Sequence, residues 1–266
     1  MSTINPAGGP WACGAGQRCP DGAGGRHAAG AAEGARAPLR PGFILVRGAP
    51  RMDPALVDAF RDVPTALVSD AQGRQLTLHH AVKPIYQPMS RLLGPALTVK
   101  ARPGDNMMAM KAIEEARPGD VLVISSDGES NLSVWGGIMA AMAVRRKVAG
   151  VVTDGLVRDV AQIRKTGLPV FATGLTPAAP TKDGPGQLNT VIACGNVIVH
   201  PGDIVIGDED GVVIVPRAEA ASVLEMVRGR QAREQMWLEH IGRDDFSPLV
   251  NTDEDFRARG CRIVSS

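Results

Sequence analysis

The stretch WGGIMAAMAVRRKVAGVVTDGLVRD, residues 135–159, decides the fold of this chain. Gly136 and Gly137 precede apolar residues that recur at helical spacing, which predicts a helix that begins at a glycine turn. The following AGVVTDG indicates a short buried strand that an Asp-Gly turn ends. Arg158 and Asp159 come directly after that strand. Because one helix and one strand separate the glycines from the Arg-Asp pair, we expect both to meet at one edge of a sheet.

The predicted helix start and the Arg-Asp pair together suit a small anionic ligand. Backbone N–H groups at a helix N-terminus favour a carboxylate or phosphate, and glycine lets a ligand approach them closely. A guanidinium beside a carboxylate would serve a metal-assisted reaction on a small carboxylate substrate. Ordinary interpretations stay open from these residues alone. A Gly-Gly pair commonly serves packing or capping, and an adjacent Arg-Asp is commonly a solvated pair of little energetic worth.

Composition limits the class of protein. The 266 residues suffice for one large α/β domain, or for at most two small ones. With 29 basic and 28 acidic side chains, nothing indicates nucleic acid or an anionic membrane as an obligatory partner. No apolar run reaches the roughly 18 residues of a transmembrane helix. Four scattered cysteines without disulfide or zinc spacing fit a reducing cytoplasm, namely Cys13, Cys19, Cys194 and Cys261.

The chain divides into three parts by composition. Residues 1–40 are rich in Gly and Ala with almost no large aliphatic side chains, so we expect a disordered extension. This segment also lacks the apolar core of a secretory signal. Residues 41–242 have the composition of a single α/β domain with mixed sheet pairing. Residues 243–266 are polar and predict a loosely held C-terminal tail.

Several other groups of side chains favour a structural role. The adjacent His79 and His80 are predicted to diverge, which argues against a metal site. The acidic Asp208, Glu209 and Asp210 precede an Asp-Gly hairpin turn, and turn formation is favoured over a cation site.

Helix packing or capping is the favoured role of Ser69 and Asp70. The methionines of the predicted helix 107–116 are interpreted as filling the core. Arg-Pro-Gly-Asp occurs at 102–105 and 117–120, and Pro-Gly-Asp again at 201–203. We interpret this as reuse of one tight turn before a structured segment, not as a solenoid repeat.

The central stretch resembles the RraA-like family, which includes 4-hydroxy-4-methyl-2-oxoglutarate/4-carboxy-4-hydroxy-2-oxoadipate aldolases and oxaloacetate decarboxylases. The resemblance covers roughly residues 51–242. Besides WGGIMA and GVVTDGLVRD, the motifs that carry it are VSDA (68–71), GPALTVKARPGDN (94–106), PGDVLVISSDG (118–128), LPVFATG (168–174) and PGDIVIGDEDGVVIVP (201–216).

The resemblance implies a fold, an assembly and an activity. The fold would be a β/β/α sandwich like the swivelling phosphohistidine domain, in a single domain. The chain would form homotrimers, sometimes paired into hexamers, with active sites between neighbouring subunits. The activity would be a divalent-metal-dependent lyase reaction on a small 2-oxo acid. Retro-aldol cleavage of a 2-oxo diacid or decarboxylation of oxaloacetate would both proceed through a pyruvate enolate.

The resemblance also implies roles for particular residues. Asp159 would ligate Mg²⁺ or Mn²⁺, and Arg158 would contact the pyruvyl oxygen of the substrate. The backbone from Gly136 through Gly137 and Ile138 to Met139 would hold the substrate carboxylate. These roles agree with the preference of a hard cation for oxygen ligands and water. On the closing helix, Glu234 matches an acidic residue that reaches the metal shell through water from a neighbouring subunit.

The chain departs from the family pattern at two positions. Aldolases of the family tend to have an acidic residue three positions after the metal-binding Asp, where this chain has Gln162. Decarboxylase-type and RraA-type members often carry Asp where this chain has Gly137. The group that accepts the hydroxyl proton in a retro-aldol reaction therefore stays open, with water on the ion as one alternative.

A competing hypothesis comes from another class of protein. The members that give the family its name are regulators that bind and inhibit an RNA-degrading endonuclease. The Arg-Asp pair does not exclude that role, although Gly137 favours the enzyme. A menaquinone methyltransferase label that homologues carry is disfavoured, because no glycine-rich loop with a downstream acidic residue would hold S-adenosylmethionine.

Overall fold

The computed structural model describes residues 42–48, 50–126 and 131–264, all within one compact unit, Arg40–Ser266. The expected disordered extension, with Cys13 and Cys19, lies outside the described residues. The described part is a mixed α/β domain, which confirms the predicted fold class. The likeness to the swivelling phosphohistidine domain stays a prediction.

A parallel sheet forms the centre of the domain. Its four neighbouring parallel strands are β3 (Leu92–Ala101), β4 (Val121–Ser125), β6 (Gly150–Thr153) and β8 (Val170–Ala172). Antiparallel strands flank them, β10 (Gly186–Leu188) beside β3 and β2 (Lys83–Pro84) beside β8. The edge strand β1 (Ile44–Leu45) pairs in parallel with β10.

Smaller strand groups attach to this sheet. The first residues of β3 pair with a hairpin made of β13 (Ile204–Asp208) and β14 (Gly211–Val215). A second hairpin consists of β11 (Ile192–Cys194) and β12 (Val197–Val199). A separate parallel group contains β5 (Ser133–Trp135), β7 (Leu156–Val157) and β9 (Gly174–Leu175).

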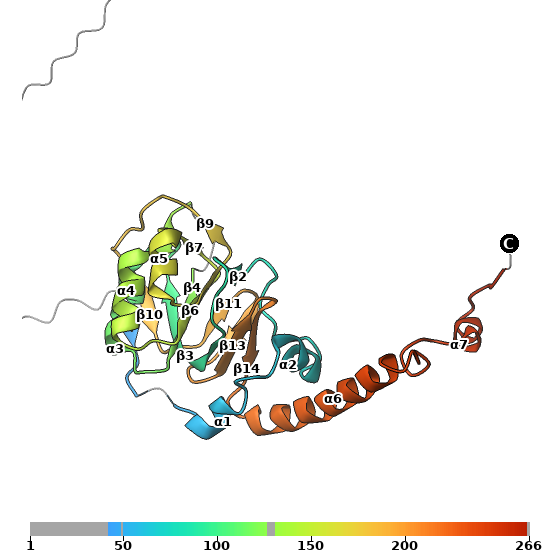
Figure 1. Cartoon of the computed structure of the whole chain (residues 1–266). Helices are drawn as coiled ribbons and strands as arrows, with labels where there is room; N and C mark the ends of the chain where they lie inside the picture. Colours follow the sequence, from blue (N-terminus) through green and yellow to red (C-terminus); the bar gives the residue numbers. More distant parts are fainter. Residues whose placement is uncertain (1–41, 49, 127–130, 265–266) are drawn as a thin grey trace, which may run out of the picture. The chain divides into compact units, whose positions relative to one another are not determined.

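The central sheet is buried on both faces, which explains its continuous apolar strands. On β4, Leu122 and Ile124 pack in one core while Val121 and Val123 pack in another, as alternation along a strand requires. Three helices cover the first face, as Figure 1 shows: α3 (Met107–Glu115), α4 (Gly137–Arg145) and α5 (Val160–Thr166). The two hairpins cover the other.

A third core lies on the outer face of the β13–β14 hairpin. It joins that hairpin to α2 (Thr65–Ala71) and to the first half of α6 (Ala220–Ile241), with α1 (Pro54–Asp58) beside it. Asp208 accepts hydrogen bonds from the backbone N–H of Thr65 (2.8 Å) and from its hydroxyl (2.6 Å). The acidic turn therefore caps a distant helix, which confirms the structural interpretation and adds a contact that the sequence did not predict.

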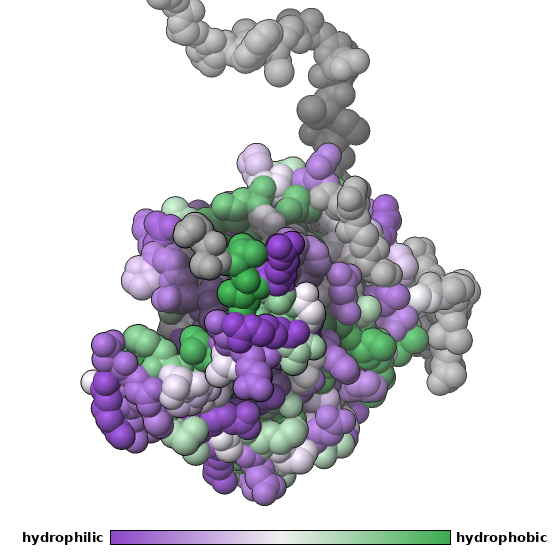
Figure 2. Space-filling model, turned by 90° about the vertical axis from the view of Figure 1, so that its right-hand side faces the viewer, coloured by the Kyte–Doolittle hydropathy of each residue, from purple (hydrophilic) through white to green (hydrophobic). Residues whose placement is uncertain are grey.

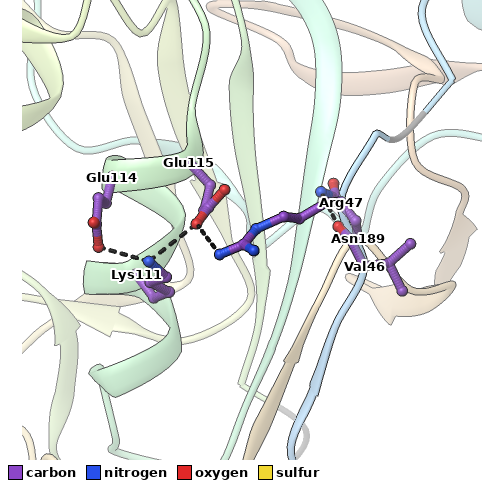
Figure 3. Close-up of polar contacts among 6 residues, drawn as sticks. All are labelled: Val46, Arg47, Lys111, Glu114, Glu115 and Asn189. Carbon is purple, nitrogen blue, oxygen red and sulfur yellow. Dashed lines mark hydrogen bonds and ion pairs between the residues drawn. The ribbon is translucent and has the colours of Figure 1, made fainter.

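The segment before residue 51 is tied to the domain by polar contacts as well as by β1 (Figure 3). The Asn189 side chain donates to the carbonyl of Val46 at 2.9 Å. Arg47 lies 3.6 Å from Glu115, which also pairs with Lys111 at 3.0 Å. These contacts attach Val46 and Arg47 to the rest of the domain.

The Pro-Gly-Asp turns are one device, as predicted. In each of the three, the Asp N–H donates to the carbonyl three residues earlier at 3.0–3.1 Å, and glycine has a positive φ of 68°, 87° or 85°. The aspartates Asp105, Asp120 and Asp203 are all buried. Asp120 and Asp203 accept the N–H of Arg117 and His200 within their own turns, at 2.8 Å each. Asp105 instead accepts hydrogen bonds from Met107 and from the loop 181–184.

Two expectations are wrong in detail. The rings of His79 and His80 do not diverge, since their centroids lie 4.2 Å apart. The methionines of α3 are not all core residues, because Met107 is 38% exposed and Met110 lines a cleft. The predicted loosely held C-terminal tail, 243–266, stays a prediction; it contains a short exposed helix, α7 (Asp253–Ala258), which begins at a capping box at Thr252.

No helix in the part of the chain that the structure describes is long and apolar enough to cross a membrane. Hydrophilic residues make up most of the face shown in Figure 2, with smaller groups of apolar residues among them.

Candidate active site

A cleft of about 360 Å³ brings together most of the residues that the sequence singled out. It lies where the start of α4, the end of β7 and the loop after β9 meet. The predicted site residues that line it are Gly136, Ile138, Met139, Arg158 and Asp159; the others are Asn106, Met110, Trp135, Ala179, Pro180 and Lys182.

Strand pairing explains why the glycines meet the Arg-Asp pair. Parallel β5 and β7 place Trp135 beside Val157, and the Arg158 N–H donates to the Trp135 carbonyl at 3.1 Å. Asp159 then begins α5 in a left-handed conformation, with φ 62° and ψ 36°. This conformation is uncommon for a residue with a side chain and is typical of strained positions at functional sites.

The Arg158 and Asp159 side chains are partly exposed and contact each other. Arg158 Nε lies 3.4 Å from Asp159 Oδ2, and both side chains are 34% exposed. The same Oδ2 accepts the N–H of Gly137 at 3.2 Å. Asp159 is thus oriented by the start of α4 while its other oxygen faces no donor in the described residues. This leaves a carboxylate oxygen for a ligand in the cleft.

The two glycines make room mainly for side chains of the chain itself. A Cβ on Gly136 would lie 3.0 Å from Asp159 Oδ2, and a Cβ on Gly137 would lie 2.2 Å from Gln162 Oε1. A side chain at position 137 and the present Gln162 side chain would therefore compete for one space. The absence of a side chain at Gly137 therefore leaves the space that the Gln162 side chain occupies.

The first turn of α4 still offers donors. The N–H groups of Ile138 and Met139 have no intrahelical acceptor, as at the start of any α-helix. An anion in the cleft would meet these donors at the positive end of the helix dipole. The Ile138 side chain is 73% exposed, so this end of the helix is accessible. The geometry suits the predicted carboxylate-binding role of residues 136–139.

Two buried polar atoms beside the cleft are unsatisfied. Asn106 Oδ1 and Trp135 Nε1 have no hydrogen-bond partner among the described residues, although Asn106 Nδ2 donates to the sulfur of Met139 at 3.2 Å. Buried polar groups are normally paired, so a lone acceptor and a lone donor mark this wall as a place of incomplete polar contacts.

The described residues of the cleft offer a metal ion one carboxylate ligand. Within the described residues, no three His, Cys, Asp or Glu side chains are grouped as a metal cage. Among the described residues that line the cleft, Asp159 is the single carboxylate. That set suits Mg²⁺ or a similar hard cation that keeps most of its waters. It does not suit a structural zinc ion, which takes four protein ligands.

Other predicted candidates lie away from the cleft. Glu234 is on the half of α6 that contributes no buried residue, and its side chain is exposed. Its predicted role from a neighbouring subunit stays a prediction. The Ser69 hydroxyl contacts that of Thr77 at 2.7 Å, and Asp70 pairs with Arg74, which agrees with helix packing. The Asp127-Gly128 turn lies outside the described residues.

Sequence reasoning missed Asn106, Met110, Trp135 and Lys182 as parts of the cleft. Met110 belongs to the predicted helix 107–116, whose methionines were interpreted as filling the core, and Asn106 is the residue directly before that helix. Lys182 lies in a Pro/Gly-rich segment that reads as a surface loop. The one available signal was that Trp135 directly precedes the glycines and Asn106 directly follows an Arg-Pro-Gly-Asp turn.

Comparison with known proteins identifies the family of this chain. A sequence model of the RraA-like family (Aldolase/RraA) matches residues 56–214, more than half of the chain. The chain belongs to the RraA-like family. Its match contains the start of α4 and the Arg158–Asp159 turn. Family membership therefore rests on the same stretch that forms the cleft.

Relatives within the family carry two kinds of name. The "Putative 4-hydroxy-4-methyl-2-oxoglutarate aldolase" of Halalkalibacterium halodurans is 37% identical over 67% of this chain and 85% of its own length. The 4-hydroxy-4-methyl-2-oxoglutarate aldolase of Thermus thermophilus is 33% identical over 42% and 68%. The structure of Streptomyces coelicolor RraAS2, an unusual member of the RNase ES inhibitor RraA family, superposes with a TM-score of 0.63 at 28% identity, over 70% and 97% of the two chains.

Proposed function

We propose that this RraA-like chain is a divalent-metal-dependent lyase that cleaves a carbon–carbon bond of a 2-oxo diacid to give a pyruvate enolate. The observation that carries the proposal is the meeting of Arg158, Asp159 and the first turn of α4 in one cleft. Both retro-aldol cleavage of a 4-hydroxy-4-methyl-2-oxoglutarate-type acid and decarboxylation of oxaloacetate yield this enolate. The names of the aldolase relatives support the first reaction.

Each group of the cleft has a chemical role in this proposal. Asp159 would hold Mg²⁺ or Mn²⁺, which supplies a Lewis acid for the 2-oxo group when bound. The N–H groups of Ile138 and Met139 bind the carboxylate next to that group. Arg158 places a fixed positive charge where the enolate oxygen develops. In a homotrimer or hexamer, Glu234 from a neighbouring subunit would contact the metal shell through water.

The two reactions differ in what else they need. Retro-aldol cleavage removes the proton of the 4-hydroxyl group while the C3–C4 electron pair moves into the enolate. Decarboxylation breaks the bond to a carboxylate and releases CO₂ without removing that proton. Asp159 is the single carboxylate in the described lining, and the neighbouring Gln162 is an uncharged amide. Decarboxylation therefore needs no base from the described lining, and its enolate takes a proton from water to give pyruvate, whereas the retro-aldol reaction needs a further proton acceptor.

Release of pyruvate tests the proposal. Purified protein should convert oxaloacetate or 4-hydroxy-4-methyl-2-oxoglutarate to pyruvate with added Mg²⁺ or Mn²⁺, measured by coupled oxidation of a reduced nicotinamide. EDTA should abolish the turnover, and excess metal should restore it. Absence of metal-dependent turnover across a panel of such acids would contradict the proposal.

The alternative function is a regulator that binds and inhibits an RNA-degrading endonuclease, which the name of the Streptomyces coelicolor relative favours. Inhibition of such a nuclease can be measured with a labelled RNA substrate. Equal inhibition by the parent chain and by Asp159→Ala, together with no pyruvate release, would support the regulator.

A further inference from the structure

One wall of the cleft is formed by an irregular loop that the proposed chemistry does not use. Ala179, Pro180 and Lys182 of this loop line the cleft with Arg158 and Asp159. The loop connects β9 to β10 and contains no regular element. Loops are more mobile than the elements they connect and bind ligands where a rigid scaffold positions them, so the contacts that hold this loop decide whether it can recognise a ligand.

Hydrogen bonds to Asp105 hold this loop in place. Its Oδ2 accepts the Thr181 hydroxyl at 2.8 Å, the Asp183 N–H at 2.6 Å and the Gly184 N–H at 3.1 Å. Its Oδ1 accepts the N–H of Met107, the first residue of α3, at 2.9 Å. One carboxylate thus joins the loop to the start of a core helix. Asp105 is only 1% exposed, so water does not compete for these bonds.

The backbone reinforces this attachment. The Thr181 N–H donates to the Gly104 carbonyl at 2.8 Å, and the Asn106 N–H donates to the Thr181 carbonyl at 3.1 Å. Burial alone would raise the pKa of Asp105, but the bonds from the Met107 and Asp183 N–H groups, the Thr181 hydroxyl and the Gly184 N–H outweigh it and lower that pKa. Asp105 is therefore an ionised acceptor whose bonds are charge-assisted.

Lys182 is the one residue between the anchored Thr181 and Asp183. Its side chain is exposed, and the structure gives it no ion-pair partner among the described residues. Lys111, by contrast, contacts two glutamates at 2.8 and 3.0 Å. Arg158, the other cation of the cleft, already lies beside Asp159. Lys182 is therefore a cation that lines the cleft on an anchored backbone, and no carboxylate in the described part of the chain forms an ion pair with it.

We propose that Lys182 binds the second carboxylate of the substrate, and that Asp105 is a positioning residue that fixes Lys182 for this contact through the Thr181–Gly184 loop. This inference rests on the proposed lyase function. It names the residue that binds the substrate carboxylate farther from the 2-oxo group. The first carboxylate meets the start of α4, and the second meets the ammonium of the loop, which lines the same cleft. The cleft then prefers a diacid over the same 2-oxo acid with an uncharged end.

Kinetics with a matched pair of substrates test the contact. The pair is 4-hydroxy-4-methyl-2-oxoglutarate and 4-hydroxy-4-methyl-2-oxopentanoate, in which a methyl group replaces the distal carboxylate. Lys182→Met keeps the length of the side chain and removes its charge. The ratio of kcat/KM for the diacid to that for the monoacid should fall by about 10–10²-fold, the range expected for one charge-assisted hydrogen bond. The loss should be in the KM of the diacid.

Two further variants serve as rescue and control. Lys182→Arg keeps the charge and should recover most of the preference for the diacid. Lys165→Met removes an exposed lysine on α5 outside the cleft and should change neither substrate. An unchanged preference in Lys182→Met would overturn the assignment, as would an equal loss for both substrates.

The positioning role of Asp105 has its own test. Asp105→Asn keeps the shape but cannot accept as many hydrogen bonds, and Thr181→Val removes one hydroxyl bond with little change in volume. Both should lower the preference for the diacid more than they lower turnover of the monoacid. A merely structural role would reduce both rates equally. Should Asp105→Asn fail to fold, Thr181→Val still decides the matter.

Binding without turnover separates this inference from the lyase function. Calorimetric titration with 2-oxoglutarate and with 2-oxobutyrate in the presence of Mn²⁺ should show tighter binding of the diacid in the parent, and loss of that difference in Lys182→Met. If no acid is cleaved but this difference is observed, the lyase function fails and the inference stands. If acids are cleaved and no difference is observed, the inference fails and the function stands.

Discussion

The sequence Arg-Pro-Gly-Asp occurs twice, at 102–105 and 117–120, and the two copies do different things. Both fold into the same turn with a buried aspartate. Asp120 accepts the N–H of Arg117 in its own turn and pairs with the Arg51 guanidinium at 2.6 Å. Asp105 instead holds the loop that forms a wall of the cleft.

The difference has an electrostatic consequence. Burial raises the pKa of Asp120, and the Arg117 N–H and Arg51 offset this only in part. For Asp105 burial acts in the same direction, but four hydrogen bonds outweigh it and the pKa is lowered. Identical local sequences thus give carboxylates with opposite shifts, because the shift depends on which donors the rest of the fold brings near.

The largest effect in the cleft is expected from Asp159→Ala. This substitution removes a carboxylate that lines the cleft and, unlike Asp105 and Asp120, is not buried in an Arg-Pro-Gly-Asp turn. Its side chain is one-third exposed and makes few bonds, unlike Asp105 and Asp120. Metal binding and turnover should vanish together while the melting temperature stays near that of the parent. Titration with Mn²⁺ beside steady-state kinetics measures both. Parent-like Mn²⁺ binding in Asp159→Ala would show that the metal assignment is wrong.

A smaller loss is expected from Arg158→Lys. Lysine keeps the positive charge but loses the planar fork of donors, so metal binding should be retained. Turnover should fall by about 10²–10³-fold, the usual loss when one oxyanion-stabilising donor is removed. The same titration and kinetics apply. A parent-like rate would exclude Arg158 from stabilising the enolate oxygen.

The two Arg-Pro-Gly-Asp turns should respond oppositely to pH. Because the pKa of Asp105 is lowered in the folded state, its contribution to stability is present above the unfolded value of about 3.9 and is lost as pH falls through the folded value. Because the pKa of Asp120 is raised, its contribution is full below about 3.9 and is lost as pH rises through the folded value.

Urea unfolding of the parent, Asp105→Asn and Asp120→Asn between about pH 3 and 6 measures this contrast. The stability gap between parent and Asp105→Asn should shrink on acidification, while the gap between parent and Asp120→Asn should shrink as pH rises. If the stability gaps of the two variants changed with pH in the same direction, the opposite pKa shifts of Asp105 and Asp120 would be contradicted.

The smallest effect is expected from deletion of residues 1–40. That segment offers almost no large aliphatic side chains for a core, and deletion keeps β1, Arg47 and the Arg51–Asp120 pair. Melting temperature, gel filtration and pyruvate release should match those of the full chain. A large drop in melting temperature would show that the segment contributes to packing.

Much of the fold followed from local pattern. The strands VLVIS and GVVT, the helix after Gly136 and the turn before α5 were predicted because their apolar periods and turn residues act within a few positions. The Asp208 cap on α2 was not predicted, since its partner Thr65 lies far away in sequence. The contact of the His79 and His80 rings depends on rotamers that sequence spacing does not specify.

For the site, the sequence by itself determined the Arg158–Asp159 turn and the glycine start of α4, because adjacent residues in a strand–turn–helix unit keep their order in space. Only the tertiary structure decided that Gln162 occupies the space above Gly137 and that Asp105 fixes the loop carrying Lys182. These contacts join segments on different helices and loops. Their distances depend on how the layers pack, which no local pattern encodes.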